Sequence, residues 1–286
     1  MMKIFNRIAE LRHNLDLERK KGHSIGLVPT MGALHHGHAQ LIKSSVESCD
    51  LTVCSIFVNP TQFNNSEDLI NYPKRQEADE RLLAEEGCDV IFAPSVEEMY
   101  PNGQQVLNMG FGFLETVLEG EFRPGHFSGV GVVVAKLLNM VQPDKAFFGQ
   151  KDLQQLAVIK KLVHDLNIPS EIVSVQTIRE PSGLAMSSRN LRLSEVEKKI
   201  ATNLYKTMQK LKAEVLDGIA IVQALNHAKA DLTDLDSFSL EYLEVVNSDT
   251  MQHVDDIKMA ENVSICAAAH VGEVRIIDNI YLKQHG

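Results

Sequence analysis

The sequence contains few cysteines, no excess of basic residues and no apolar run long enough to cross a bilayer. Its four cysteines form no C-x-x-C pair, which argues against a disulfide scaffold and favours free thiols in a reducing compartment. The longest apolar runs, such as VGVVVAKLL, are too short for a transmembrane helix, and the N-terminal MMKIFNRIAELRHNL lacks the apolar segment of a secretory signal. We therefore expect a cytoplasmic protein.

The charge balance argues against two classes of partner. The formal net charge is −10, with 28 Lys and Arg against 38 Asp and Glu, and no basic tract offsets the resulting field. Because phosphates are repelled by such a field, we expect neither a nucleic-acid partner nor binding to a membrane surface. A small anionic substrate is compatible with this charge, since a local positive pocket can exist within an acidic protein.

The first part of the chain alternates between strand-like and helical patterns. Apolar, strand-like runs occupy 24–29, 51–58, 88–94, 145–149 and 171–178. Helical patterns occupy 37–48, 74–87, 129–141 and 150–166. Strands that alternate with helices predict an α/β fold with a Rossmann-like, doubly wound parallel sheet. In a chain of 286 residues we assign this larger domain to residues 1–177.

The pattern changes near residue 180. Ser194 begins a capping box, S-E-V-E, which predicts the start of a long amphipathic helix, and a second helical pattern covers 219–232. Three strand-like runs follow, at 239–247, 263–270 and 273–282. Helices followed by strands predict a separate, smaller α+β domain, which we place at 178–286.

The stretch TMGALHHGH, from Thr30 to His38, lies between a predicted strand and a predicted helix. At such a junction the helix presents its unpaired N–H groups to an anion. Gly32 and Gly37 allow a ligand to approach the backbone closely. His35 and His38 are three residues apart, so one helical turn directs both rings towards the same phosphate. We therefore predict a phosphate-binding turn, in which imidazole N–H groups stabilise charge on a phosphoryl oxygen.

Two other interpretations of this stretch remain open. A zinc ion needs three or four convergent ligands, and no H-E-x-x-H, C-x-x-C or neighbouring carboxylate completes such a set around these histidines. The second alternative is a plain turn in which the histidines have no role. We expect His36 to face solvent in either case.

Other polar stretches lie at predicted strand and domain ends. AMSSRN offers the hydroxyls of Ser187 and Ser188 and the guanidinium of Arg189 to a polyphosphate, or it is a polar loop between the domains. FFGQKDLQQL places Lys151 at a strand–helix junction, where it binds a nucleotide or is a solvated surface lysine. SIFVNPTQF ends a strand with amide side chains, which suit a small acid bearing hydroxyls or are ordinary loop amides.

One glycine pair invites a different interpretation, which we reject. SGVGVVVAKL does not complete a dinucleotide-binding fingerprint, because Val134 stands where the third glycine is needed. We expect Gly129 and Gly131 to allow close helix packing instead.

These stretches together resemble a known family. H-x-G-H after a first strand is similar to the nucleotide-binding motif of the nucleotidyltransferase and class I aminoacyl-tRNA synthetase superfamily. The stretches PTMGALHHGH, SIFVNPTQF, EGEFRPGHFSGV, FFGQKDLQQL and AMSSRNLRLS, in this order, resemble the pantoate–β-alanine ligase family over most of the chain. Within that resemblance, AMSSRN is similar to the mobile loop that replaces the K-M-S-K-S motif of the synthetases.

The resemblance implies an enzyme that condenses (R)-pantoate with β-alanine. ATP would be the co-substrate, pantoyl adenylate the intermediate, and AMP and pyrophosphate the released products, within pantothenate biosynthesis. The resemblance also implies Mg²⁺ and a homodimer. Asp79 would hold the Mg²⁺ by analogy, although the sequence alone places it on a solvated helix face in KRQEADERLL.

The resemblance further implies specific roles for residues. His38 and His35 would be catalytic, and Gln62, Gln155 and Asn59 would bind pantoate and β-alanine. The implied ATP-binding residues are Thr30, Met31, Gly32, Ala33, Leu34, His35, His36, Gly37, His38, Gly149, Gln150, Lys151, Asp152, Ile178, Met186, Ser187, Ser188 and Arg189.

Three other functions share parts of these motifs. A nucleotidyltransferase acting on a small phosphorylated substrate has the same H-x-G-H core, although a phosphate pocket should hold more Arg and Lys than the amides Gln62 and Gln155. A non-catalytic nucleotide-binding module would bind without turnover. A tRNA synthetase is disfavoured by the net charge of −10 and the small second domain.

Overall fold

The computed structural model describes residues 2–64, 66–101, 103, 107–233 and 235–284, and the chain divides into two compact units. The first unit comprises Met1–Gly149 and Val158–Gln176, and the second comprises Gln150–Ala157 and Thr177–Gly286. The sequence patterns place all of 150–157 in the first domain. In the structure this segment packs with the second unit instead, because its turn is held by the C-terminal strand.

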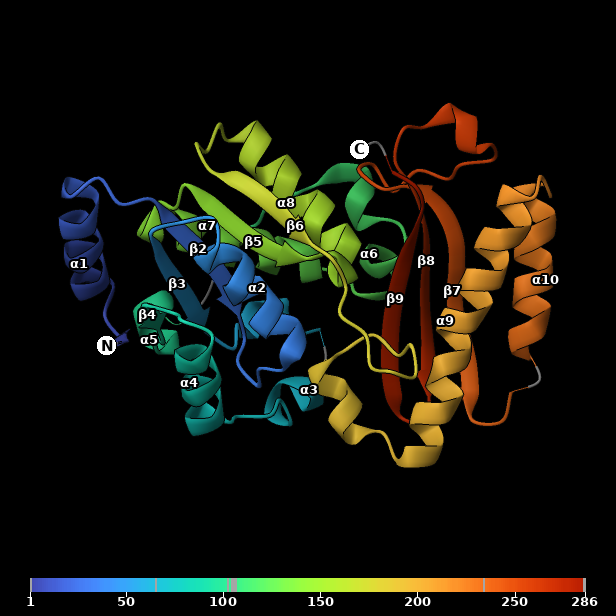
Figure 1. The fold of residues 1–286 in the computed structure, drawn as a ribbon, viewed down its shortest axis with the longest axis horizontal. Coiled ribbons are helices and arrows are strands. Elements are labelled where there is room, and N and C mark those ends of the chain that lie inside the picture. Colours follow the sequence, from blue (N-terminus) through green and yellow to red (C-terminus); the bar gives the residue numbers. More distant parts are fainter. Residues whose placement is uncertain (1, 65, 102, 104–106, 234, 285–286) are drawn as a thin grey trace. The chain divides into compact units, whose positions relative to one another are not determined.

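A parallel sheet forms the centre of the first unit (Figure 1). Within the described residues its six strands run in the order β1-β4-β3-β2-β5-β6, and neighbours pair in parallel throughout. The strands are β1 (Lys3–Phe5), β2 (Ile25–Thr30), β3 (Leu51–Ile56), β4 (Val90–Phe92), β5 (Lys145–Gly149) and β6 (Glu171–Val175). The direction of strand addition reverses between β2 and β5, and α/β sheets bind ligands at the carboxyl ends of strands at such a switch point.

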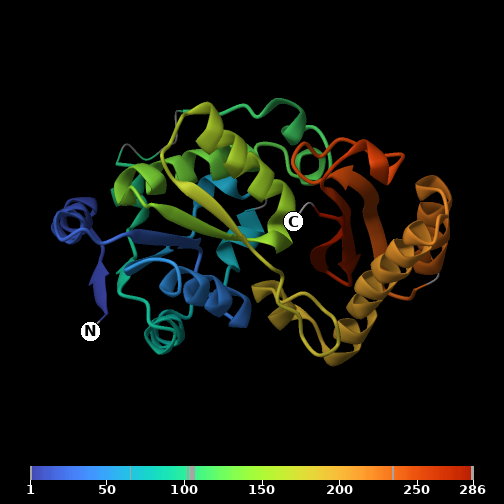
Figure 2. The same ribbon diagram turned by 45° about the horizontal axis from the view of Figure 1, so that its top comes forward.

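Helices cover both faces of this sheet. They are α1 (Ile8–Lys20), α2 (His36–Val46), α3 (Ser66–Ile70), α4 (Gln76–Glu85), α5 (Val96–Met99), α6 (Glu119–Phe122), α7 (His126–Val141) and α8 (Leu153–Asp165). Figure 2 shows α7 and α8 on one face, with α2 and α4 on the opposite face. Strands covered on both sides need apolar side chains in both directions, and β3 is accordingly buried from Leu51 to Ser55. The predicted Rossmann-like parallel sheet is confirmed.

An antiparallel sheet and two helices form most of the second unit. The strands β7 (Phe238–Asn247), β8 (Val263–Val271) and β9 (Val274–Lys283) pair in that order. The helices α9 (Glu195–Leu216) and α10 (Ile221–Thr233) lie on one face of this sheet (Figure 1). Ser194 and Glu197 form the predicted capping box, in which each side chain accepts the backbone N–H of the other residue. The predicted α+β fold of this part is confirmed.

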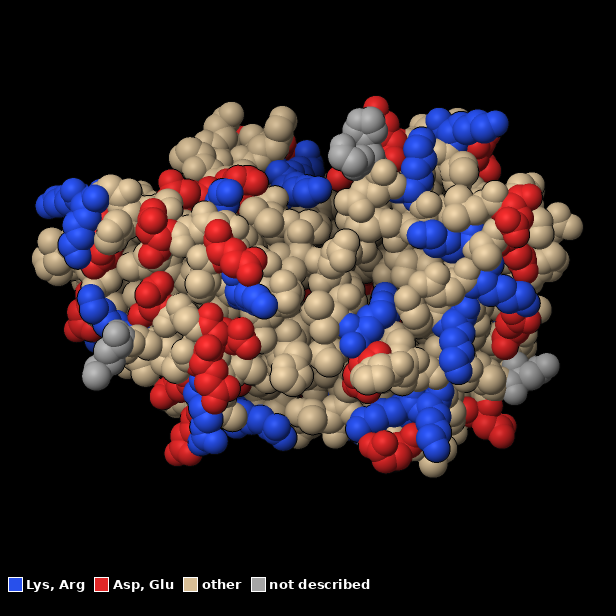
Figure 3. Space-filling view, viewed as in Figure 1, with Lys and Arg blue, Asp and Glu red and all other residues tan. Residues whose placement is uncertain are grey.

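The charged side chains on the surface and the character of the helices match two features of the sequence, its mixture of charges and its short apolar runs. Acidic and basic side chains lie interspersed over the face drawn in Figure 3. Across the parts of the chain that the structure describes, no helix has the length and apolar character needed to cross a membrane.

Candidate active site

The turn between β2 and α2 lies at the carboxyl end of the sheet's switch point. Gly32 and Ala33 both have left-handed backbone conformations, with φ of 80° and 50°. A Cβ on Gly32 would lie 3.0 Å from Asp79 Oδ2 and 3.1 Å from a methyl carbon of Ile56. Glycine therefore suits this position for its backbone freedom and for the close approach of its neighbours.

Asp79 of α4 holds this turn from the protein interior. Its Oδ2 accepts the N–H of Ala33 at 2.8 Å, and its Oδ1 accepts the N–H of Leu34 at 2.7 Å. Burial raises the pKa of Asp79 above its ordinary value, and the two backbone hydrogen bonds oppose that change. The prediction that Asp79 lies on a solvated helix face is wrong, because its side chain is only 2% exposed. Helical periodicity in KRQEADERLL gives no indication that one acid faces a backbone turn.

His35 and His38 cap the N-terminus of α2 reciprocally. The Nδ1 of His35 accepts the N–H of Gly37 at 3.1 Å, and the Nδ1 of His38 accepts the N–H of His35 at 3.3 Å. The ring centroids lie 4.1 Å apart. The arrangement is a capping box in which imidazoles take the places of the usual hydroxyl and carboxylate.

This capping fixes the tautomers of the two rings. A ring nitrogen that accepts a hydrogen bond carries a lone pair, so a neutral imidazole then holds its proton on the other nitrogen. In their neutral forms, His35 and His38 therefore both carry their N–H on Nε2. The turn thus presents two imidazole donors at the helix N-terminus, whereas His36, as expected, is exposed to solvent.

A buried amide cluster follows β3. Asn59 Oδ1 accepts hydrogen bonds from the hydroxyls of Tyr100 at 2.8 Å and Thr61 at 3.0 Å. Asn59 Nδ2 donates to Gln62 Oε1 at 3.0 Å and to the carbonyl oxygen of Gly129 at 3.3 Å. These contacts use both donors and both lone pairs of the Asn59 amide, whose side chain is 1% exposed. Burial also raises the pKa of Tyr100, which keeps its hydroxyl protonated as a donor.

The amide of Gln62 consequently has a defined orientation. Its Oε1 faces Asn59, and its Nε2 lies 3.2 Å from the sulfur of Met31. This sulfur is a weak acceptor and belongs to the turn between β2 and α2. The backbone carbonyl oxygen of Gln62 is hydrogen-bonded to Nδ1 of the buried His126 at 2.8 Å. Gln62 therefore directs N–H groups, and not its oxygen, towards the Met31 side.

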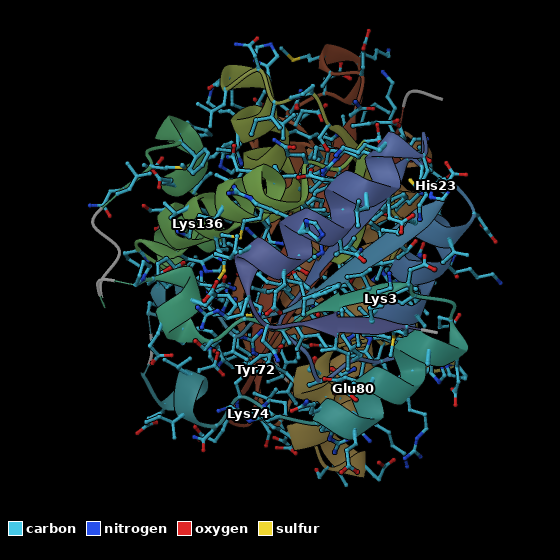
Figure 4. All side chains as sticks on the ribbon, turned by 90° about the vertical axis from the view of Figure 1, so that its left-hand side faces the viewer. Lys3, His23, Tyr72, Lys74, Glu80 and Lys136 are labelled. Carbon is cyan, nitrogen blue, oxygen red and sulfur yellow. The ribbon has the colours of Figure 1, made fainter. Side chains whose placement is uncertain are left out.

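Helix α7 packs closely behind this cluster. A Cβ on Gly129 would lie 2.4 Å from the carbonyl oxygen of Thr61, so only glycine lets the helix approach the 3-10 turn Pro60–Gln62. The predicted packing role of Gly129 and Gly131 is confirmed, since a Cβ on Gly131 would meet the ring of Phe111 at 2.6 Å. Lys136, labelled on α7 in Figure 4, lies with its ammonium 5.4 Å from the ring centroid of Tyr100.

Apart from Gly149, which ends β5 in the first unit, the remaining predicted residues lie in the second unit. After β5 ends at Gly149, a 3-10 turn, Gln150–Asp152, leads into α8. Gln150 is buried, Lys151 and Gln155 are partly exposed, and Asp152 is exposed. The stretch AMSSRN is an ordered turn, because Ser187 Oγ accepts the N–H of Arg189 at 3.3 Å and Met186 donates its N–H to the carbonyl of Ile178 at 3.0 Å. The side chains of 186–189 are partly exposed.

The structure thus brings several predicted residues together within the first unit. The hydrogen bonds given above join the turn at 31–38 to Asp79 through Ala33 and Leu34, and to Gln62 and Asn59 through Met31. Sequence reasoning did not identify Tyr100, which anchors Asn59, and no local motif distinguishes it from any other buried tyrosine. Around these positions and elsewhere in the described residues, no group of three or more His, Cys, Asp and Glu side chains is arranged to hold a metal ion.

Comparison with known proteins gives the family. The family model of pantoate–β-alanine ligase matches residues 3–281. The pantothenate synthetase of Cytophaga hutchinsonii is 46% identical over 276 residues, which cover 96% of this chain and 97% of the relative. That of Bacteroides thetaiotaomicron is 44% identical over 283 residues, with 99% and 100% covered.

Solved structures agree with these relatives. The crystal structure of pantothenate synthetase from Thermus thermophilus superposes with a TM-score of 0.93 at 40% identity, covering 99% of this chain and 100% of that one. The pantoate–β-alanine ligase of Francisella tularensis, complexed with β,γ-ATP and β-alanine, gives a TM-score of 0.80 at 35% identity, with 99% and 98% covered. This chain therefore belongs to the pantoate–β-alanine ligase family.

Proposed function

We propose that this chain condenses pantoate with β-alanine in an ATP-dependent reaction that passes through pantoyl adenylate. The observation that carries the proposal is the reciprocal capping by His35 and His38, at the carboxyl end of β2 beside the switch point of the sheet, which leaves each neutral ring with its N–H on Nε2. A nucleotide phosphate is the ligand that such a position favours. The relative from Francisella tularensis, complexed with β,γ-ATP and β-alanine, supports both as substrates.

The first step joins pantoate to AMP. An oxygen of the pantoate carboxylate attacks the α-phosphorus of ATP, the bond to the bridging oxygen breaks, and pyrophosphate leaves. The carboxylate is ionised at neutral pH, so this step needs no general base. It needs positioning and the stabilisation of charge on the phosphoryl oxygens, and we assign the latter to the Nε2–H groups of His35 and His38.

The matching motifs of the family also assign ATP-binding roles to residue 151 and to residues 187–189. Lys151, on the turn that follows β5, supplies a cation for the polyphosphate. Ser187, Ser188 and Arg189 supply hydroxyl groups, backbone N–H groups and a guanidinium. These assignments follow the matching motifs of the family, and the ordered, partly exposed turn at 186–189 supports them.

The second step forms the amide bond. The neutral amine of β-alanine attacks the acyl carbon of pantoyl adenylate, the acyl–oxygen bond breaks, and AMP leaves with that oxygen. The nitrogen loses one proton as pantothenate forms. A neutral His38 that holds its proton on Nε2 is a hydrogen-bond donor at that nitrogen. Its role in both steps is therefore to stabilise phosphate charge, and not to accept the proton that the β-alanine nitrogen loses.

Pantoate binding rests on the amides. Because Asn59 fixes the oxygen of Gln62, we propose that Gln62 donates its Nε2–H to the carboxylate or a hydroxyl oxygen of pantoate, in the position where Met31 now accepts. Gln155 is the second pantoate-binding residue. The earlier expectation that Asn59 itself binds substrate gives way to a positioning role, since its four hydrogen-bonding positions are used within the protein.

Among the residues that the structure describes, no group of His, Cys, Asp and Glu side chains forms a site for Mg²⁺. Both carboxylate oxygens of Asp79 accept backbone N–H groups, and its side chain is buried, so it is a poor ligand for an ion that keeps several waters. We therefore propose that Mg²⁺ enters with ATP, bound to phosphate oxygens and water, and we assign Asp79 to positioning of the 33–34 backbone. The homodimer and the cytoplasmic location remain predictions.

Pyrophosphate exchange tests this function. The protein is incubated with Mg-ATP, labelled pyrophosphate and pantoate, without β-alanine. We expect label in ATP when pantoate is present and not when it is omitted, because only reversal of adenylate formation returns pyrophosphate to ATP. Exchange that requires a phosphorylated substrate in place of a carboxylic acid would favour a nucleotidyltransferase, and ATP binding without exchange would favour a binding module.

A further inference from the structure

A buried asparagine of the C-terminal strand holds the turn that carries Lys151. Asn279 of β9 donates from Nδ2 to the carbonyl oxygens of Gln150 and Lys151, each at 2.9 Å. Its Oδ1 accepts the side-chain Nε2–H of Gln150 at 3.2 Å. The side chain of Asn279 is 3% exposed and that of Gln150 is 6% exposed, so water does not compete for these bonds.

These bonds fix the directions of two backbone N–H groups. In a trans peptide the C=O and N–H point in opposite directions. The carbonyls of Gln150 and Lys151 point at Asn279, so the N–H groups of Lys151 and Asp152, which share those two peptide planes, point away from β9. The same two peptide planes flank the Cα of Lys151 and therefore also set the direction in which its side chain leaves the backbone.

Asn279 is itself held by an ion pair. Asp278 Oδ1 accepts the backbone N–H of Asn279 at 2.8 Å. Arg179 donates to both carboxylate oxygens of Asp278, at 2.6 and 2.9 Å, and to the carbonyl of Asn279 at 3.2 Å. The guanidinium also lies 3.8 Å from the ring centroid of Tyr205 and donates to the carbonyl of Gly183 at 3.1 Å. A planar, bidentate and stacked arginine of this kind has little freedom.

The network links two segments to which ATP binding is assigned. Arg179 and Gly183 lie at the base of the segment that continues into 185–190, where Asn190 Nδ2 donates to the carbonyl of Ala185 at 3.0 Å and to Glu180 at 3.1 Å. Gln150 and Lys151 form the other segment. Asp278 and Asn279 contact both, and neither is among the residues that the motifs indicate.

We propose that Asn279, held by Asp278 and Arg179, is a positioning residue for ATP binding, which acts by orienting Lys151 and the backbone N–H groups of Lys151 and Asp152. This inference rests on the proposed function, because it takes Lys151 as an ATP-binding residue. Asn279 does not itself contact the nucleotide. Its removal therefore weakens ATP binding only to the extent that Lys151 and the turn lose their orientation.

A double-mutant cycle on ATP binding tests the proposal. The dissociation constant of Mg-ATP is measured by calorimetry for the wild type, N279A, K151A and the double variant. We expect N279A and K151A each to weaken binding by about tenfold or more, as the loss of such polar contacts does. We expect the double variant to bind only about twofold more weakly than the weaker single variant, since Asn279 acts through the turn that carries Lys151. Effects that multiply, or wild-type binding by N279A, would overturn the proposal.

Hydrogen exchange supplies a readout that general destabilisation does not give. In N279A the amides of 151–153 should exchange faster than in the wild type, while those of α9 keep their rates. The matched control is S264A on the neighbouring strand β8, which removes the buried hydrogen bond between Ser248 and Ser264, 2.7 Å long, and none of the bonds of Asn279 to the turn. It should lower the melting temperature without changing ATP binding. If N279A does not fold, N279S, whose side chain is too short to reach both carbonyls, takes its place.

The failures of the two proposals are distinguishable. If wild-type protein shows no pantoate-dependent pyrophosphate exchange, the proposed function fails whatever N279A does. If exchange is normal and K151A binds ATP as the wild type does, Lys151 is not an ATP-binding residue and the role of Asn279 fails with it. If exchange is normal and K151A is impaired while N279A is not, the positioning role alone fails.

Discussion

His35 and His38 cap the same helix N-terminus, each ring accepting a backbone N–H through Nδ1, with ring centroids 4.1 Å apart. The capping and the proposed chemistry thus use opposite nitrogens of each ring. Nδ1 of each ring accepts a backbone N–H of the turn, and Nε2 is the nitrogen that we propose to donate to the phosphate. Either function can therefore be removed separately.

The tautomers are directly measurable. With the imidazoles labelled with ¹⁵N, we expect both His35 and His38 at neutral pH to show an unprotonated Nδ1 and a protonated Nε2, because Nδ1 accepts a hydrogen bond in each. His36, which is exposed, serves as the internal reference for a solvated ring. A protonated Nδ1 on His35 or His38 would contradict the capping arrangement.

Substitution of His38 separates capping from catalysis. His38 is the N3 residue of the capping box, and the Oδ1 of an asparagine there takes the place of Nδ1 as acceptor for the N–H of His35. H38N should therefore keep a melting temperature near that of the wild type while lacking any group at the place of Nε2. We expect its turnover to fall by about 10²–10³, the loss typical for one donor that stabilises developing charge. H38A should lose the same turnover and also about 1 kcal/mol of stability, because it removes the hydrogen bond from the N–H of His35. Near-normal turnover by H38N would refute the phosphate role of the ring.

The orientation of Gln62 predicts the effect of changing Asn59. In N59D both oxygens are acceptors, so the one that replaces Nδ2 repels Gln62 Oε1 and favours a flipped amide that directs oxygen towards pantoate. We expect the KM for pantoate to rise by about 10- to 100-fold, since hydrogen bonds to charged groups contribute about 1.5–3 kcal/mol. The KM for ATP should change little. The control is Y100F, which leaves Thr61 bonded to Asn59 Oδ1 and should raise the KM for pantoate less. An unchanged KM in N59D would show that Gln62 is not oriented in this way.

The buried carboxyl of Asp79 gives a pH dependence of stability with a defined sign. Its folded pKa is raised, chiefly by burial, so the folded chain holds this proton more tightly than the unfolded chain does. The stability that comes from this difference is present below the unfolded pKa, about 4, and is lost as the pH rises through the folded pKa. Asparagine at this position does not titrate. The stability of the wild type relative to D79N, from urea unfolding at a series of pH values, should therefore fall as the pH rises above about 4. A difference that rises with pH would show that the backbone hydrogen bonds outweigh burial.

The fold was largely predictable because its strands and helices carry regular patterns. The runs at 51–58 and 145–149 are apolar throughout, as buried parallel strands require, and β3 and β5 lie within them. Strand β1, Lys3–Phe5, was not predicted, because three residues are too few to show a periodic pattern. Its place at the edge of the sheet depends on pairing with β4, which lies far along the chain. Helix α1 was also missed. Its two buried leucines, Leu11 and Leu15, are four residues apart, so the helical spacing was present in the sequence and was overlooked.

The site was predictable where its residues are contiguous and not where they are remote. TMGALHHGH combines glycines, histidines and a strand end in one stretch, so its place in the fold follows from its flanks. Asp79, Tyr100 and Asn279 act on predicted residues from 41 to 129 positions away in the chain, through hydrogen bonds that no local pattern encodes. Residues 150–157 group with the second unit, and the hydrogen bonds of their turn to Asn279 are equally remote in the sequence.

Oxygen transfer tests the proposed reaction most directly. Pantoate labelled with ¹⁸O in its carboxylate is incubated with Mg-ATP and β-alanine, and the AMP is analysed by mass spectrometry. Attack of the carboxylate on the α-phosphorus, followed by loss of AMP from the acyl carbon, predicts one ¹⁸O in each AMP molecule and the other in the new amide. AMP without ¹⁸O, or labelled oxygen found only in released phosphate, would contradict the adenylate mechanism.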